Sequence, residues 1–583
     1  MARRSVRCGL AAALATVALL AGCATVPTSG PLREHESDGQ QIEPGVRVAP
    51  VPPVTDASPM LIVEGFLHAM GTDQADFAVA RQYLTPAAAS AWHPESGTLI
   101  YAAGYQPRET EASTDDQPVI TLETVLTGSL NSLGEYREAS GGHRHDFGLV
   151  RSEGQWRISH PPEGLLISRD HFYTNYTALN LHFLDATGAV LVPDPRYLAE
   201  NSITPKRLVE LQLAGPGEWL APAVRRAAWS DTVVEEVETL PQGVAVLHLA
   251  SAASTFTNEQ RRTLMAELTT TLTAATQAEA LQFSLGSTLL PLPDSTSVTL
   301  TAADFASLAP AGQPGVQLLT MRDGSVYPVP LREPWREGEP MAAGLTPAGA
   351  FAVRSDLAEL ASVNPEGTTL TVTDLGTKTA AVLREGDRLL RPGYSRMNEL
   401  WTIGGGAGAA GFTVFDAKEH TQIPVTAPDF PTDPVRAFRL SPDGARIALV
   451  LDGPKLDGVA VEQIGIARVV RTADGIEVAG FRPVTVSPPA EAARGVLDVG
   501  WQTATELLVL VSHRVTSSVV QVDQGSARAD DIGPADVAGL RELAVIPGRQ
   551  PVLRGPAAVY RFEGSFNWGL TGLAADAIAY PGA

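Results

Sequence analysis

The stretch RLSPDGARIALVLDG, residues 439–453, places a turn of small and polar residues directly before an apolar run. The proline and glycine in it favour a tight turn, because proline fixes φ and glycine accepts a positive φ. The aliphatic run that follows predicts a buried strand. Units of the same kind recur elsewhere in the C-terminal half: GLTPAGAFAVRS (344–355), LLRPGYSRMNELWTIG (389–404), DVGWQTATELLVLVS (498–512) and AVIPGRQPVLRG (544–555).

The spacing of these units is roughly 45–60 residues, which is the length of a propeller blade with four strands. Their turn, best seen as SPDG at residues 441–444, resembles the turn of TolB-type or WD-like blades, and DGSVYPV (323–329) adds an earlier unit. We therefore expect residues 300–583 to form an all-β propeller of about five to seven blades. The alternative architecture is a β-sandwich or two smaller all-β domains.

The N-terminus has the pattern of a secretory signal peptide. A basic segment with three arginines (residues 3–7) precedes an apolar run over residues 9–22, which has signal-peptide length and is short for a membrane span. The run ends in a sequence that resembles the lipobox of bacterial lipoproteins, with its members Leu20, Ala21, Gly22 and Cys23. We expect residues 1–22 to be a lipoprotein signal peptide; an ordinary signal peptide followed by a chance cysteine is the alternative.

The lipobox resemblance implies that Cys23 is the first mature residue and carries S-diacylglyceryl and N-palmitoyl groups. Several acyl chains on one residue anchor a protein far better than a single chain does. Residues 23–57 are rich in Pro, Ser, Glu and Gly and predict a flexible tether with a reach of roughly 30–40 Å. The expected location is therefore the cell membrane, lipid-anchored and facing outside the cytoplasm.

Residues 58–165 predict a small α+β domain. Ser58-Pro59 is a helix start, and apolar residues at helical spacing follow up to Gly71. Strand-like segments come next, and the last of them, GQWRIS (154–159), contains a tryptophan. This order of helices followed by antiparallel strands resembles the NTF2-like fold.

Residues 166–295 predict a second α+β domain. TALNLHFLD (177–185) predicts a strand, and AVLVPDPRYL (189–198) predicts a strand that runs into a turn. Thr257 with Gln260 fits a capping box at the start of a helix. The order VPDPRYL, TPKRLVELQLAGP and LPQGVAVLHLA, which starts at residue 192, resembles the GerMN module of sporulation and envelope proteins.

Composition narrows the function classes. The 583 residues suggest roughly three to four domains. A net charge of −22 and a pI near 4.9 argue against a nucleic-acid binder, because phosphate contacts need clustered Lys and Arg. The two cysteines, Cys8 and Cys23, both precede the predicted domains, so no disulfide is expected in the body.

The glycine-rich segment Gly404–Gly411 contains a formal GxGxxG. A dinucleotide site needs a helix directly after this motif, with its N-terminus toward the pyrophosphate. Here the strand-like FTVFD (412–416) follows, so the segment predicts a hairpin connection and no nucleotide site.

Other polar groupings are weaker. His143 and His145 alternate on one strand beside Asp146 and could bind a metal, but a solvated strand start is the favoured interpretation. The acidic pairs at 115–116 and 530–531 fall in loop-like stretches and predict solvated carboxylates. No catalytic, cofactor-binding or metal-binding residue is assigned, and the chain is not expected to be an enzyme.

The whole domain order, together with GQWRISHPPEGLLISRDHF (154–172), resembles the LpqB family of actinobacterial lipoproteins over nearly the full chain. The resemblance implies an accessory role in two-component signalling. It implies contact with the extracytoplasmic part of the sensor kinase MtrB, modulated phosphorylation of the regulator MtrA, and effects on cell-wall homeostasis and division. No residue of a partner-binding surface follows from the resemblance.

Two other functions are compatible with these modules. The first is a cell-wall glycan or muropeptide binder, in which the NTF2-like domain or a propeller face holds envelope material. The second is an envelope hydrolase, because propeller enzymes scatter their catalytic residues along the sequence. Binding to purified cell wall, or turnover of envelope fragments, would separate these functions from kinase binding.

Overall fold

The computed structural model describes residues 49–582, except at short internal gaps. The gaps are residues 73–74, 112, 226–232, 311–315, 331–333, 346–348, 405–410, 429, 431–433, 454, 457–458, 461–462, 485, 487–494, 514, 525–528 and 535–536. The signal peptide 1–22, the lipobox residues Leu20, Ala21, Gly22 and Cys23, and most of the tether lie outside the described residues. They stay predictions. Residues 49–582 belong to one compact unit.

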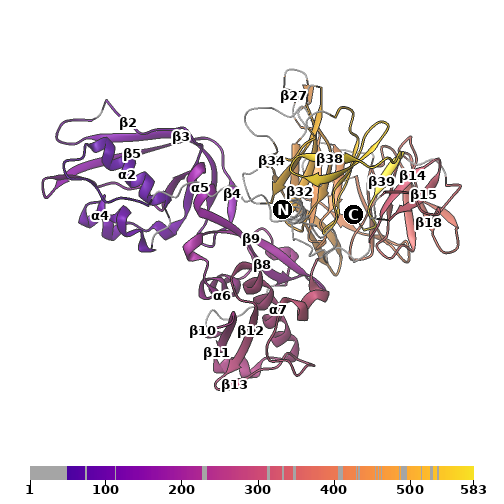
Figure 1. The fold of residues 1–583 in the computed structure, drawn as a ribbon, viewed down its shortest axis with the longest axis horizontal. Helices are drawn as coiled ribbons and strands as arrows, with labels where there is room; N and C mark the ends of the chain where they lie inside the picture. The colour runs from indigo at the N-terminus through magenta and orange to yellow at the C-terminus, as the bar shows by residue number, and fades with distance from the viewer. Residues whose placement is uncertain are drawn as a thin grey trace, which may run out of the picture. The chain divides into compact units, whose positions relative to one another are not determined.

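The first domain packs short helices on a curved, mostly antiparallel sheet (Figure 1). Its helices are α2 (Pro59–Gly71), α3 (Ala78–Gln82), α4 (Pro86–Ala91) and α5 (Arg169–Asn175). Its strands are β1 (Thr98–Tyr101), β2 (Arg108–Glu109), β3 (Val119–Leu130), β4 (Tyr136–Glu138), β5 (Gly142–Ser152), β6 (Gln155–Ile158) and β7 (Leu165–Ser168). The prediction of an α+β domain is confirmed.

Helix α2 forms as its sequence dictates. Ser58 caps it by accepting a hydrogen bond from Leu61 N, and a proline occupies the first turn. Its apolar stripe, which includes Val63 and Phe66, is buried against the sheet. The sheet has the strand order β6-β5-β3-β1-β7, in which β7 pairs with β1 in parallel, Leu165 facing Thr98. The first sheet therefore continues to Ser168, past the predicted boundary at residue 165.

The second domain combines a long two-stranded ribbon with a small sheet and two helices. The ribbon is β8 (Tyr176–Leu184) with β9 (Leu191–Ala199). The other elements are α6 (Pro205–Ala214), β10 (Val234–Leu240), β11 (Val244–Leu249), α7 (Asn258–Ala275), β12 (Ala280–Leu285) and β13 (Thr288–Leu289). The predicted capping box is present, because Thr257 Oγ1 accepts from Gln260 N and Gln260 Oε1 accepts from Thr257 N.

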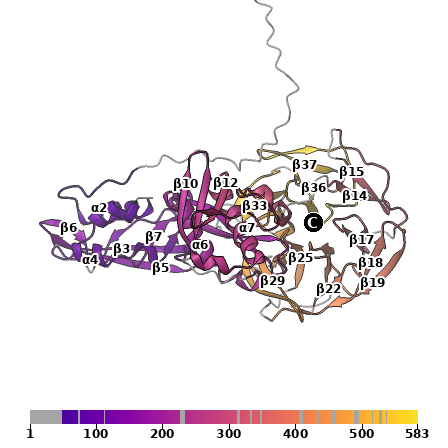
Figure 2. The ribbon, with the colours of Figure 1, turned by 90° about the horizontal axis from the view of Figure 1, so that it is seen from below.

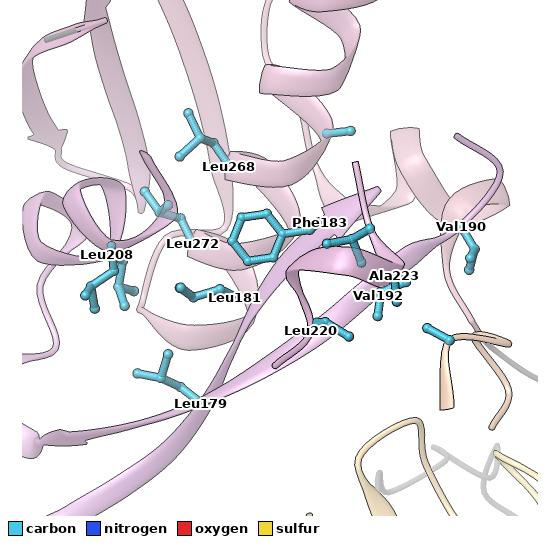
Figure 3. Packing of buried hydrophobic residues seen from close by; sticks show 14 of the residues in the cluster. Leu179, Leu181, Phe183, Val190, Val192, Leu208, Leu220, Ala223, Leu268 and Leu272 are labelled. Atoms are coloured by element: carbon cyan, nitrogen blue, oxygen red, sulfur yellow. The ribbon is translucent and has the colours of Figure 1, made fainter. Parts of the chain in front are cut away.

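Strand β9 differs from the prediction of a strand running into a turn. It continues through Pro193 and Pro195 to Ala199 and stays in register with β8. Proline is tolerated because β9 pairs on one edge only, so a missing N–H disrupts no second ladder. Buried side chains from this ribbon and from α6 and α7 form the core in Figure 3, with Phe183 between Leu181 and Leu268.

The described residues of the C-terminal region contain six sheets of three or more strands, which we number as blades. Blade 1 is β14 (Leu318–Arg322), β15 (Ser325–Val329) and β39 (Ala577–Ala579); blade 2 is β16 (Ala350–Val353), β17 (Glu359–Val363), β18 (Thr369–Asp374) and β19 (Ala380–Glu385). Blade 3 is β20 (Gly393–Tyr394), β21 (Glu399–Ile403), β22 (Phe412–Asp416) and β23 (Gln422–Ile423).

The remaining blades complete the ring. Blade 4 is β25 (Val435–Leu440), β26 (Arg446–Leu451), β29 (Gln463–Thr472) and β30 (Gly475–Pro483), with β24 (Val425–Thr426) added at its edge. Blade 5 is β31 (Gly495–Trp501), β32 (Glu506–Ser512), β33 (Ser517–Asp523) and β34 (Ala529–Asp531). Blade 6 is β35 (Glu542–Ala544), β36 (Val552–Arg554), β37 (Val559–Gly564) and β38 (Asn567–Leu570). A small hairpin, β27 (Lys455–Leu456) with β28 (Val459–Ala460), projects from blade 4.

The blades surround a common centre, as Figure 2 shows. Their inner strands contact one another in the closed order β39, β16, β20, β25, β31, β35 and back to β39. The C-terminal strand β39 closes the ring by pairing with β14, with Thr320 facing Ile578. The predicted all-β propeller is confirmed, and the six described sheets lie within the expected five to seven.

Candidate functional site

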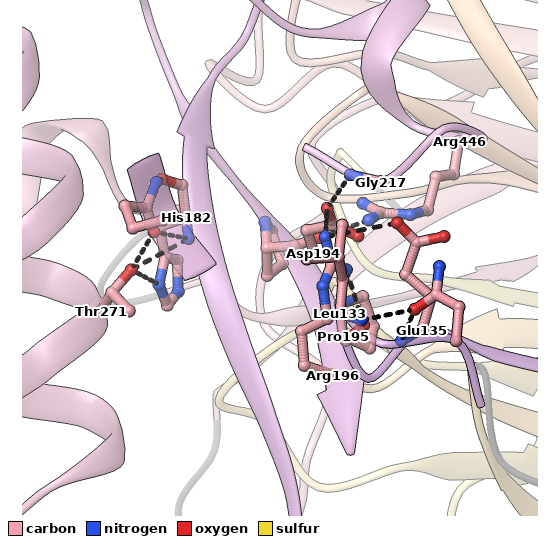
Figure 4. Close-up of polar contacts among 12 residues, drawn as sticks. Leu133, Glu135, His182, Asp194, Pro195, Arg196, Gly217, Thr271 and Arg446 are labelled. Carbon is pink, nitrogen blue, oxygen red and sulfur yellow. Dashed lines mark hydrogen bonds and ion pairs between the residues drawn. The ribbon is translucent and has the colours of Figure 1, made fainter. Parts of the chain in front are cut away.

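The second domain meets the propeller at a buried ion pair. Arg446, at the start of β26, pairs with Asp443 and donates a second hydrogen bond to Pro193 O in β9 (Figure 4). The side chains of Arg446 and Asp443 are 1% and 0% exposed. Asp443 itself comes from the SPDG turn and also accepts from Ala445 N at 2.8 Å. A turn that builds the blade therefore also orients the arginine that holds the second domain.

A second charged group lies one residue further along β9. Asp194 Oδ2 accepts from Arg196 Nη2 at 2.8 Å and from Gly217 N at 2.7 Å. Arg196, whose side chain is 1% exposed, is also 3.7 Å from Glu135 Oε1 in the first domain. Because a buried charge is costly without partners, this network fixes both the ribbon and the loop that carries Glu135.

Trp219 forms the third contact with the propeller. Its indole Nε1 donates to Gly480 O in β30 at 2.6 Å, and Arg468 Nη1 donates to Trp219 O at 3.3 Å. The Arg482 guanidinium lies 5.0 Å from the ring centroid. Burial lowers the pKa of Arg482 to about 10, so this cation–π contact is partly desolvated and stronger than a surface one.

Tyr197 joins all three domains. Its ring packs on Phe172 and Tyr136 of the first domain, with centroids 5.1 and 5.9 Å away. Its hydroxyl donates to Asp523 Oδ2 in blade 5 at 3.2 Å. Burial first, and the neighbouring Glu506 carboxylate second, raise the pKa of Asp523 to about 7.

These contacts make the second domain and blades 4 and 5 one packed body. A single cluster of buried apolar side chains runs from Phe183 in β8 through Trp219 to Val499 and Trp501 in β31. Interfaces between domains stay rigid when they are large and hydrophobic. The arrangement is suited to presenting a fixed surface to a partner.

A repeated contact joins neighbouring blades on the face that carries the second domain. The turns between the third and fourth strands of blades 2 and 3, DLGTKT (374–379) and DAKEHT (416–421), have the same pattern. In each, the leading aspartate accepts backbone N–H groups of the turn, and the fifth residue, Lys378 or His420, has a positive φ.

The basic residue of each of these turns contacts the preceding blade. Lys378 Nζ donates to Met341 O beside blade 1, and His420 Nε2 is 2.6 Å from Glu359 Oε2 of blade 2. In blade 4 the corresponding residue is Arg471, which donates to both oxygens of Glu399 in blade 3 at 2.7 and 2.8 Å. Burial alone would raise the pKa of Glu399, but the hydrogen bonds and the charge of Arg471, together with hydrogen bonds from Trp401 and Ser395, outweigh burial and lower that pKa.

The residues singled out from the sequence lie in several places. Gly404 and Gly411 flank residues 405–410, which lie outside the described residues. They connect the paired strands β21 and β22, and Gly404 N donates to Gly411 O at 3.1 Å, so the predicted hairpin is confirmed. The lipobox with Cys23 is outside the described part, and its lipidation stays a prediction.

In the described residues, the histidines of β5 form no shared group with the acidic pairs at 115–116 and 530–531. His145 Nε2 donates to His160 O at 3.2 Å and its ring packs edge-on to Phe147, while Asp146 pairs with Arg144. Burial lowers the pKa of His145. The acidic pair 115–116 is exposed in a turn, and the pair 530–531 is exposed in β34.

Neither a metal-binding cluster nor a membrane-spanning helix is found among the described residues. They contain no group of three or more His, Cys, Asp or Glu side chains placed to hold a metal ion. None of the helices in the described part of the chain has both the length and the hydropathy of a membrane span.

Sequence reasoning missed the three contacts between the second domain and the propeller. Arg446, Trp219 and Tyr197 are single residues in otherwise ordinary elements, and their partners lie more than 200 positions away. The blade-to-blade contacts had a signal, because both turns share Asp, a basic residue four positions later and then Thr.

Family models match three parts of the chain. The model of the lipoprotein LpqB N-terminal domain matches residues 52–173, and that of the lipoprotein LpqB β-propeller domain matches residues 336–553. The Germane model, described as sporulation and spore germination, matches residues 180–289. The two LpqB models together match more than half of the 583 residues.

Relatives align over nearly the whole chain. Lipoprotein LpqB of Cutibacterium acnes is 28% identical over 97% of this chain and 98% of its own length. Lipoprotein LpqB of Thermobifida fusca is 27% identical over 94% of both chains. Lipoprotein LpqB of Streptomyces avermitilis is 28% identical over 100% of this chain and 99% of its own length.

Proposed function

Because this chain belongs to the LpqB family of lipoproteins, we propose that it is an accessory protein of two-component signalling. In this proposal it is anchored by lipid on Cys23 and faces outside the cytoplasm. There it binds the ectodomain of an MtrB-like sensor kinase and modulates phosphorylation of the kinase's response regulator. The downstream effects concern cell-wall homeostasis and division.

The observation that carries the proposal is the shared domain order over the full length. The alignment with the Cutibacterium acnes relative covers 97% of this chain, so the N-terminal segment, both α+β domains and the propeller are retained together. A protein that only needed an anchor or a single binding module would not require all of them. The lipoprotein name of the relatives agrees with the lipobox at residues 20–23.

The packed junction supports a binding role. Arg446 of the propeller donates to Pro193 O, and Trp219 of the second domain donates to Gly480 O, so buried hydrogen bonds hold the second domain on the propeller. A pre-oriented surface loses less entropy on binding than a mobile one. The names of the family models describe a lipoprotein, a propeller and a Germane domain, and they name no enzyme.

The test uses the purified full chain and the kinase ectodomain of the same organism. We expect surface plasmon resonance to detect binding to immobilised ectodomain, and deletion of the gene to change the phosphorylated fraction of the regulator on phosphate-affinity gels. Absence of binding together with an unchanged phosphorylated fraction would contradict the proposal.

A second candidate function is binding of envelope material. A pocket between blades 2 and 3, on the propeller face that carries the second domain, favours it. Incubation of the full chain with purified cell wall, followed by sedimentation, tests this function separately from kinase binding.

A further inference from the structure

The pocket between blades 2 and 3 has a volume of about 380 Å³. It lies at the point where His420 of blade 3 contacts Glu359 of blade 2. Its lining includes small apolar walls from Ala358, Ala380, Ala381 and Ala417. The volume is near the lower end of the range for small-molecule sites.

The same contact at the next junction uses a larger side chain. Arg471 of blade 4 reaches Glu399 of blade 3 with two hydrogen bonds and also donates to Gly444 O at 2.6 Å. At the junction of blades 2 and 3 the corresponding residue is the smaller His420, whose side chain is 33% exposed. The junction that carries the pocket therefore has an imidazole where the next junction has a bidentate arginine.

The groups of the pocket differ in how much of their hydrogen-bonding capacity is used. Glu359 accepts from His420 Nε2 and from the Tyr394 hydroxyl, at 2.6 and 2.7 Å. Arg354 donates to Asp356 through Nε and Nη2, and to Ala417 O through Nη1. Both groups are occupied by the protein itself.

Three other groups keep capacity toward the pocket. Within the described residues, no hydrogen bond involves His420 Nδ1 or the Lys418 ammonium, and those to Asp374 all fall on its Oδ1. The backbone N–H of Thr377 lowers the pKa of Asp374, so this carboxylate is ionised at neutral pH. The pocket thus offers the Lys418 ammonium on one turn and a carboxylate oxygen of Asp374 on the other.

We propose that this pocket binds a small zwitterion, an amino acid or dipeptide with a small apolar side chain. Its carboxylate would lie against the Lys418 ammonium, and its ammonium would lie against Asp374. The alanine side chains of the lining leave room for a methyl-sized side chain and offer it apolar contact. The proposal goes beyond the kinase-binding function and does not depend on it.

Isothermal titration of the purified full chain with alanyl-alanine tests the proposal. We expect a dissociation constant below about 10 mM, and at least about tenfold weaker binding of both alanyl-alaninamide and N-acetyl-alanyl-alanine. Titration with free alanine distinguishes an amino-acid site from a dipeptide site, because only a dipeptide site would prefer alanyl-alanine. No heat with either ligand, or equal affinity for the amide and the acid, would overturn the proposal.

Variants of this chain provide the controls. His420→Arg copies the contact that Arg471 makes in blade 4, so the propeller keeps its fold while the larger side chain occupies the pocket, and binding is lost. Lys418→Ala removes one exposed charge and weakens binding about tenfold. Lys206→Ala, which removes an exposed charge from α6, leaves binding unchanged. Unaltered affinity in both pocket variants would contradict the assignment.

Discussion

Replacement of Arg446 by methionine tests the junction between the second domain and the propeller. Methionine keeps much of the length and removes the guanidinium that pairs with Asp443 and donates to Pro193 O. Asp443 is 0% exposed and would remain buried without its cation. Breaking a buried pair from one side costs about 3–5 kcal/mol, because the other charge is left unpaired.

A second substitution separates this cost from the loss of the domain contact. Asp443→Asn in the Arg446→Met background removes the unpaired charge while Ala445 N keeps an amide oxygen to donate to. The double variant should therefore recover about 1–3 kcal/mol relative to Arg446→Met alone. The remaining deficit measures the hydrogen bond to Pro193 O.

The assay is urea unfolding followed by tryptophan fluorescence, with hydrogen exchange of residues 191–199 as a local readout. The single variant should unfold at lower urea and exchange faster in β9 than the wild type. An unchanged midpoint and unchanged exchange in Arg446→Met would refute the reasoning. So would a double variant that is less stable than the single variant by the full cost of Asp443→Asn.

Three further predictions concern other contacts. Burial lowers the pKa of His182 from 6.5 to about 4, so the unfolded chain binds more protons than the folded chain between these pH values. The free energy of unfolding therefore falls by up to about 3 kcal/mol as the pH drops through this range. His182→Asn should remove that part of the pH dependence in unfolding titrations, and an unchanged slope would contradict the prediction. Trp219→Ala should lower the free energy of unfolding by about 3–5 kcal/mol and expose the junction to limited proteolysis. A variant that resists protease as well as the wild type does would contradict this role of Trp219. Thr257→Ala should cost about 1 kcal/mol by removing the α7 cap, measured by the unfolding midpoint, while Thr255→Ala, just before that helix, serves as the control.

Local sequence patterns predicted the elements that depend on local physics. The Ser58-Pro59 start of α2, the capping box at Thr257 and the SPDG turn of blade 4 each satisfy their backbone groups within a few residues. Such interactions are visible in one stretch of sequence, and the structure has all three. The closure of the ring by β39 depends instead on a pairing across most of the propeller.

Features that depend on contacts between distant residues could not be predicted in the same way. Two prolines in β9 indicate a turn, but the strand persists because it pairs with β8 along its length and Arg446 of the propeller donates to Pro193 O. Arg446 occupies the first position of its strand, where blades 2 and 3 carry Glu359 and Glu399. A buried arginine at that position depends on Asp443 of the same blade and on Pro193 O of the docked second domain.

The candidate site was partly visible in the sequence. The shared turns at 374–379 and 416–421 could have been found as a repeat with a basic fifth residue. Their contacts to the preceding blade, and the pocket beside His420, require the ring to be assembled. The proposed lipid anchor at Cys23 would depend on recognition by processing enzymes, and Cys23 lies outside the described residues.

We propose that lipid on Cys23 places the folded domains within reach of a sensor-kinase ectodomain. Photo-crosslinking in intact membranes, comparing wild type with Cys23→Ala, tests it most directly. We expect a crosslink between the wild-type chain and the kinase. For Cys23→Ala we expect both loss of that crosslink and loss of the protein from carbonate-washed membranes. A Cys23→Ala chain that stays in the washed membranes and crosslinks to the kinase as the wild type does would contradict it.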